Sequence, residues 1–289
     1  MQNNSAAEAS LAVQSTRDNS STLAKQARLL TSLTAHNSLL VALSGGADSA
    51  YLAWAAHRTL GDRALAITAL SASFPAYDRE QVEAFVREAR LRHEFIETHE
   101  FENPLYVTNS PDRCYHCKDE LFEQMDKLAT QRGFAAIAYG INADDTHDFR
   151  PGHRAAAEHR VLAPLLEVGL TKSEIRSLSR QAGLRTWDRP ASACLSSRVP
   201  YGTQVTPEIL RRIERGEEIL RRLGFRQFRV RAHGELARIE IAPDELPRAL
   251  DPAMTREFAA LFKPLGFAYV TLDLEGYRQG SLNDVLKKG

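Results

Sequence analysis

Six consecutive residues, Ser44-Gly45-Gly46-Ala47-Asp48-Ser49, combine two glycines with a carboxylate and two hydroxyl groups. An apolar run, 39–43, precedes them and a helical pattern follows, so the glycines fall where a strand turns into a helix. Glycines let backbone N–H groups approach a ligand closely, and a helix N-terminus adds its positive dipole end. The pattern therefore predicts a phosphate-binding loop. The alternative is a simple tight turn, with Asp48 and Ser49 as ordinary first-turn residues.

The loop has no lysine after its glycines, so it is not the Walker-type loop that holds the β- and γ-phosphates. It resembles instead the Ser-Gly-Gly-x-Asp-Ser loop of ATP-pyrophosphatases. That resemblance implies that the loop holds the pyrophosphate end of ATP while an acceptor attacks the α-phosphorus. The implied nucleotide ligands are Ser44, Gly45, Gly46, Asp48 and Ser49. Mg²⁺, which prefers oxygen ligands, is the expected metal at the phosphates.

The three cysteines are the second group that could do chemistry. Cys114 and Cys117 lie three positions apart at the expected start of a helix, so both thiols can point to one side. Cys194 lies in a loop bounded by Pro190 and Pro200. An odd number of cysteines without an export signal argues against a disulfide framework.

Three interpretations of these thiols stay open on the residues alone. A cubane iron–sulfur cluster held by three cysteines would leave one iron open to carry a transferable sulfide. A zinc site would need a fourth ligand, such as His116 or His147. The cysteines could also be unrelated, since a free cysteine is commonly a small buried hydrophobe.

The elements that must position these groups alternate between strand and helix. Apolar runs and helical periodicity predict a parallel α/β sheet with the doubly wound arrangement. The expected strands are 39–43, 64–70, 95–96 and 135–139, and the expected helices are 48–60, 79–90, 114–132 and 172–183, the last opened by the capping-box spacing of Thr171 and Glu174.

The pattern changes after residue 200 and predicts a smaller α+β domain. Thr206 and Pro207 open a helix that runs to Leu223. Strands at 228–232, 236–241 and 269–274 then surround a helix at 254–262. We therefore expect a flexible arm over 1–20, a nucleotide domain over 21–200 and a C-terminal domain over 201–289.

Composition limits the partners. The chain of 289 residues has 37 basic and 37 acidic residues, so it offers no general attraction for a nucleic-acid backbone. No apolar run approaches the roughly 20 residues that span a bilayer, and the N-terminus lacks the apolar segment of a signal peptide. We expect a cytoplasmic protein.

Longer motifs carry a more specific resemblance. The stretch from Pro190 to Gly202, Pro-Ala-Ser-Ala-Cys-Leu-Ser-Ser-Arg-Val-Pro-Tyr-Gly, resembles the LarE family of ATP-dependent sulfur transferases when it is joined to the nucleotide loop. Further matching motifs are Tyr139-Gly140, Asp148-Phe149-Arg150-Pro151-Gly152, Phe228-Arg229-Val230-Arg231 and the ending 269–278. The resemblance implies an adenine nucleotide alpha hydrolase-like fold (a PP-loop domain) and a homo-oligomer.

The resemblance also implies a reaction and a substrate. Members of this family adenylate the ring carboxylates of pyridinium-3,5-biscarboxylic acid mononucleotide and convert them to thiocarboxylates for the nickel-pincer cofactor of lactate racemase. The adenylate turns a poor electrophile into one with a good leaving group, so that sulfur from sulfide or another donor can attack. One type sacrifices a cysteine that falls at the position of Ala193, and another binds a [4Fe-4S] cluster through three cysteines. The three cysteines match the second type.

Matching motif to motif assigns the remaining roles. Cys114, Cys117 and Cys194 would hold the cluster, and Cys194, Lys118 and Asp48 would be catalytic, with Lys118 stabilising phosphate charge. Substrate binding would fall to a set of charged residues in the C-terminal motifs: Arg198, Glu217, Arg229 and Arg231. The alternatives are a solvated Lys118, a surface Glu217, and an outward strand face for Arg229 and Arg231. Rival functions are a tRNA-thiolating enzyme on the same fold and a protein that binds ATP without turnover.

Overall fold

The computed structural model describes residues 20–147, 151–190, 193–278 and 280–282. The chain forms two compact units whose segments alternate along the sequence. Unit 1 holds residues 1–69, 80–96 and 121–191, and unit 2 holds residues 70–79, 97–120 and 192–289. The predicted arm lies, apart from Ser20, outside the described residues, and the predicted domain boundary at residue 201 stays a prediction.

Unit 1 contains a four-stranded sheet with the order β3-β2-β1-β4. The strands are β1 (Leu39–Ala42), β2 (Ala64–Leu70), β3 (His93–Glu97) and β4 (Ala136–Tyr139). Strand β1 pairs in parallel with both β2 and β4, which confirms the predicted parallel α/β sheet. All four residues of β1 are buried, as expected for a strand at the centre of a parallel sheet.

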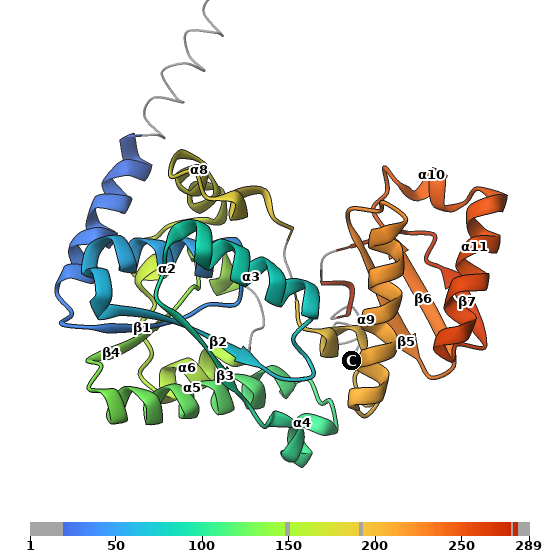
Figure 1. The fold of residues 1–289 in the computed structure, drawn as a ribbon, viewed down its shortest axis with the longest axis horizontal. Helices are drawn as coiled ribbons and strands as arrows, with labels where there is room; N and C mark the ends of the chain where they lie inside the picture. The colour runs from blue at the N-terminus through green and yellow to red at the C-terminus, as the bar shows by residue number, and fades with distance from the viewer. Residues whose placement is uncertain (1–19, 148–150, 191–192, 279, 283–289) are drawn as a thin grey trace, which may run out of the picture. The chain divides into compact units, whose positions relative to one another are not determined.

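Helices cover both faces of this sheet. In Figure 1, α2 (Ala47–Leu60) and α3 (Ala76–Ala89) lie over one face, and α5 (Arg113–Arg132) and α6 (Gly152–Glu158) lie over the other. Residues 20–34 form a further helix, and the unit is completed by α7 (Pro164–Glu167) and α8 (Lys172–Gln181). Helix α8 begins with the predicted capping box, in which Thr171 and Glu174 each bond the other's backbone. No helix in the described part of the chain is both long and apolar enough to cross a membrane.

Unit 2 contains a separate three-stranded sheet with the order β5-β6-β7. Strand β5 (Phe228–His233) pairs antiparallel with β6 (Leu236–Ile241), and β6 pairs in parallel with β7 (Tyr269–Leu272). Its helices are α4 (Pro104–Val107), α9 (Pro207–Arg222), α10 (Leu246–Ala249) and α11 (Pro252–Phe262). The small mixed sheet and its helices confirm the predicted α+β pattern.

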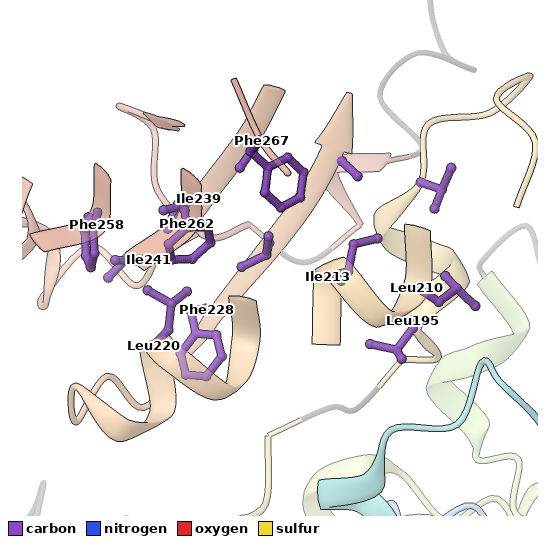
Figure 2. Close-up of a cluster of buried hydrophobic side chains, with 14 of the residues drawn as sticks. Leu195, Leu210, Ile213, Leu220, Phe228, Ile239, Ile241, Phe258, Phe262 and Phe267 are labelled. Carbon is purple, nitrogen blue, oxygen red and sulfur yellow. The ribbon is translucent and has the colours of Figure 1, made fainter. Parts of the chain in front are cut away.

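The core of unit 2 forms between α9 and this sheet (Figure 2). Leu210, Ile213 and Leu220 repeat at helical spacing on α9 and are fully buried. Tyr106 of α4 and Leu195, which both come before α9 in the sequence, belong to the same buried cluster. The core therefore fixes the segment before α5 and the loop after residue 193 to one compact unit.

Candidate functional site

Strand β1 and helix α2 place the glycine loop at the carboxyl end of the sheet in unit 1. Gly45 has a φ of 78°, a left-handed conformation that glycine adopts without strain. Gly46 is the N-cap of α2 and offers no side-chain cap to the first N–H groups of the helix. The hydroxyl of Ser49 accepts from the Ser44 N–H at 3.2 Å and donates to the Gly46 carbonyl at 3.1 Å. The loop is therefore preformed, and the N–H groups at the start of the helix could donate hydrogen bonds to a phosphate.

Two contacts from elsewhere in unit 1 fix the loop. The guanidinium of Arg189 donates to the Gly45 carbonyl at 2.7 Å. Gly140, which follows β4, lies against α2 so closely that an added Cβ would fall 2.6 Å from the backbone N and Cα of Ser49. A side chain at position 140 would therefore displace the start of α2.

Asp48 is the most chemically distinctive residue of the loop. Its Oδ2 accepts from Asn142 Nδ2 at 3.1 Å and lies 3.5 Å from Lys172 Nζ. Its Oδ1 is buried and has no hydrogen-bond partner in the described part of the chain. Burial raises the pKa of Asp48, Lys172 and Asn142 oppose the shift, and Asp145 adds to it. A buried carboxylate oxygen without a partner fits a hard cation such as Mg²⁺.

Asn142 and Lys172 belong to no motif that the sequence alone reveals. Asn142 follows β4, which is paired with β1, and Lys172 is the first residue of α8. The pairing of β4 with β1 brings Asn142 beside Asp48, and the start of α8 brings Lys172 there, although the two residues lie 94 and 124 positions away in sequence. Their proximity to the glycine loop could have been inferred only from the rule that ligands bind at the carboxyl ends of parallel strands.

The three cysteines all lie in unit 2. Burial raises the pKa of the Cys117 thiol, with further contributions from Glu100, Cys194 and Cys114 and an opposing one from Lys118. Each of these groups is therefore within electrostatic range of Cys117. Because Arg113, next to Cys114, donates to the Ser196 carbonyl, the structure places the Cys194 loop beside the start of α5, where Cys114, Cys117 and Lys118 lie.

Buried guanidinium groups hold the loop that carries Cys194. Arg198 donates to the carbonyls of Ala193 and Cys194, the latter at 2.8 Å. Arg231 donates to the Ser197 carbonyl at 3.0 Å, and Arg113 donates to the Ser196 carbonyl at 2.7 Å. Backbone carbonyls on both sides of Cys194 thus accept bonds from charged donors, which are stronger than neutral ones.

Arg198 and Arg231 also form buried ion pairs. Arg198 bonds both carboxylate oxygens of Glu217, at 2.9 and 3.1 Å, with side chains 2% and 7% exposed. Burial alone would lower the pKa of Arg198, but Glu217 reverses the effect and the pKa is raised. Arg231 makes the equivalent forked contact with Glu240 on β6. Glu217 and Arg231 are therefore neither surface charges nor part of an outward strand face.

Arg229 lies on the same face of β5 as Arg231 and contacts a different set of groups. It donates to the Phe228 carbonyl at 2.7 Å, and its guanidinium lies 5.1 Å from the centre of the Tyr277 ring. Burial and the neighbouring Arg198 lower its pKa, which Glu217 opposes. The structure thus groups the four predicted substrate residues beside the Cys194 loop within unit 2.

The side chains around the cysteines bear on the predicted metal site. No group of three or more His, Cys, Asp or Glu side chains within the described ranges is arranged to hold a metal ion. The side chain of His147, a suggested zinc ligand, and the motif residues 148–150 lie outside the described residues. Thiolates are ligands of both zinc and iron–sulfur clusters, so the residue types alone suit either kind of site.

Comparison with known proteins sets these features in a family, although no model of a known protein family matches the chain. An uncharacterised protein of Synechocystis is 44% identical over 249 residues, covering 86% of this chain and 93% of its own length. An uncharacterised protein of Methanocaldococcus jannaschii is 32% identical over 172 residues, covering 60% of this chain and 66% of its own length. The pyridinium-3,5-bisthiocarboxylic acid mononucleotide synthase of Lactiplantibacillus plantarum is 33% identical over 267 residues, which is 91% of this chain and 95% of that protein. Because this similarity spans nearly the whole length of both chains, the protein belongs to the family of that synthase, the LarE family.

Proposed function

We propose that this chain is an ATP-dependent sulfur transferase that converts the carboxylates of pyridinium-3,5-biscarboxylic acid mononucleotide to thiocarboxylates for nickel-pincer cofactor synthesis. The proposal rests on the full-length similarity to the Lactiplantibacillus synthase. It is supported by the uncapped glycine loop with its buried Asp48 and by the three cysteines gathered in unit 2. A synthase of this kind is expected to need both an activating nucleotide and a source of sulfur.

The first half-reaction forms an acyl adenylate. A carboxylate oxygen of the substrate attacks the α-phosphorus of ATP, and the bond from that phosphorus to the bridging oxygen breaks, so that pyrophosphate leaves. The N–H groups at the start of α2 would stabilise the pyrophosphate charge, and Lys172 would supply positive charge. Mg²⁺ bound at Asp48 would neutralise phosphate oxygens.

The second half-reaction transfers sulfur. A sulfide sulfur attacks the acyl carbon, the bond from that carbon to the AMP oxygen breaks, and AMP leaves with the oxygen. We propose that Cys114, Cys117 and Cys194 hold a [4Fe-4S] cluster, which would supply the sulfur on its open iron. Arg229 would bind the substrate's phosphate or carboxylate, while Arg198, Arg231 and Glu217 keep the Cys194 loop in place.

Pyrophosphate release tests the adenylation step. The purified protein, incubated with MgATP and the pyridinium biscarboxylate, should release pyrophosphate, and Asp48→Asn should slow release by about 10²- to 10³-fold. Asp62→Asn, at an exposed carboxylate after the other end of α2, is the matched control and should behave as wild type. Tight ATP binding without pyrophosphate release would indicate a non-catalytic nucleotide-binding protein. Release with tRNA alone would indicate a thiolating enzyme.

Anaerobic purification tests the source of sulfur. About four irons and four acid-labile sulfides per chain are expected, and Cys114→Ala or Cys117→Ala should remove both the iron and catalytic turnover. Neither element in protected material would contradict the cluster. If activity then stopped after one sulfur per chain and depended on Cys194 alone, the cysteine itself would be the donor.

A further inference from the structure

Asn109 connects the segment before α5 to the loop that follows Cys194. It is fully buried, and its φ of 57° places it in the left-handed region, which asparagine tolerates better than most residues. Its side-chain amide donates to the carbonyls of Val199, Pro200 and Thr203, at 3.3, 2.7 and 2.9 Å. Its own carbonyl accepts from the Gly202 N–H at 3.1 Å. One residue is therefore bonded to four of the five residues in the stretch 199–203.

Arg113 continues this connection up to the first cysteine. The side chain is buried, and one guanidinium nitrogen donates both to Asn109 Oδ1 and to the carbonyl of Ser196. Ser196 also lies 2.7 Å, oxygen to oxygen, from the hydroxyl of the buried Tyr106. Because Arg113 directly precedes Cys114, its fixed position also fixes the start of α5 relative to the loop.

We propose that Asn109 and Arg113 form a latch that sets the position of Cys194 relative to Cys114 and Cys117. The two are positioning residues, which touch loop carbonyls and each other. The residue types suit the role, because an amide can donate to the carbonyls through its nitrogen while its oxygen accepts from Arg113. A guanidinium reaches several acceptors, whereas an ammonium is a point charge. The inference deepens the sulfur-transfer proposal, on which its biological meaning rests, but it concerns thiol geometry alone.

Cross-linking of the thiols measures this geometry directly. Dibromobimane joins two thiols only when they lie close together, and peptide mass spectrometry identifies which pair was joined. Applied to the metal-free full-length protein, it should join Cys114 to Cys117 and also join Cys194 to one of them. The Cys114–Cys117 product is an internal reference, because both thiols belong to the same helix, α5.

The decisive variant is Asn109→Gly, which accepts the left-handed backbone and removes only the side chain. The ratio of Cys194-containing product to Cys114–Cys117 product should fall at least about tenfold, because small displacements strongly reduce proximity-driven reactions. Arg113→Met should lower the ratio similarly, and Arg113→Lys should restore part of it. The matched control is Asn103→Gly, which removes the cap of α4 in the same segment and should leave the ratio unchanged.

Circular dichroism identifies variants that are folded. A folded Asn109→Gly protein with the wild-type ratio would overturn the proposal, as would a wild-type protein in which Cys194 is joined to neither partner. If Asn109→Gly does not fold, the proposal is tested instead by the ratio of Cys194-containing product to Cys114–Cys117 product in the two Arg113 variants. No ATP or substrate is present, so a protein inactive in sulfur transfer still gives a clear result, and failure of the latch is distinguishable from failure of the proposed reaction.

Discussion

At the scale of single residues, the Arg198–Glu217 pair is almost out of contact with water. Replacing Arg198 with Met leaves the carboxylate of Glu217 buried without its main partner, which should lower the free energy of unfolding by about 3–5 kcal/mol. The double variant Arg198→Met/Glu217→Met should recover part of this loss. Urea unfolding followed by circular dichroism measures both.

Arg222→Met removes an exposed pair with Glu218 on the same helix and should cost less than about 1 kcal/mol. Equal costs for the two arginines would show that burial does not set the strength of the Arg198–Glu217 pair.

His93 gives the protein a specific sensitivity to acid. Burial lowers the pKa of His93 to about 4 from its ordinary 6.5, against the opposing influence of Glu83 and Glu94. As the pH falls, the His93 imidazole therefore becomes protonated in the unfolded chain before it does so in the folded protein. The stability that His93 contributes above pH 6.5 is lost as the pH falls toward 4. His93→Gln should flatten the dependence of unfolding free energy on pH across this window. His99→Gln, at an exposed histidine, should leave the curve unchanged; a flattened curve there would count against the assignment.

At the scale of elements, the approach of β4 to α2 depends on Gly140. Gly140→Ala places a Cβ 2.6 Å from the Ser49 backbone, so the helix must shift, at a cost of about 1–3 kcal/mol and with loss of the proposed ATP binding. Gly46→Ala meets only the Ser44 hydroxyl, at 3.6 Å, and should keep wild-type stability while weakening ATP binding. Thermal unfolding and nucleotide titration of the two variants separate the effects. A Gly140→Ala protein of normal stability would contradict so close an approach.

The elements themselves were largely predictable from local signals. Thr171 with Glu174 and Thr206 with Pro207 mark helix starts that the structure confirms, because capping depends on neighbouring residues. The apolar pattern predicts a last strand that runs to residue 274, but β7 ends at Leu272, and no pattern marks α4, α6, α7 or α10. Short helices of this kind lack the length that a periodic pattern needs.

The site was predictable only where the signal lies in one stretch of sequence. The glycine loop and the CxxC pair are such stretches, and their positions follow from the elements around them. Asn109 and Lys172 act through contacts 90 or more residues away, which no periodicity records. The sequence motif named Arg198 and Arg231, but their burial against Glu217 and Glu240 depends on the folded unit.

At the scale of the whole molecule, the alternation of the two units predicts how the chain tolerates truncation. A fragment ending at residue 200 keeps residues 70–79 and 97–120 but loses most of unit 2, including the α9 and β5 side chains that share a buried cluster with Tyr106. We expect this fragment to expose that apolar surface and aggregate, as judged by size-exclusion chromatography. The full-length chain under the same conditions is the control. A monodisperse, folded fragment would show that unit 1 is independent of the remainder.

The same alternation sets the order of events on the ribosome. Cys114 and Cys117 emerge well before Cys194, and at ordinary elongation rates the interval is roughly 4–15 seconds. During that time the cluster that contains Tyr106 lacks both Leu195 and α9, and Cys114 and Cys117 belong to a unit 2 that cannot yet fold. Any chemistry that needs all three thiols must therefore wait until the segment from Cys194 through α9 has been synthesised.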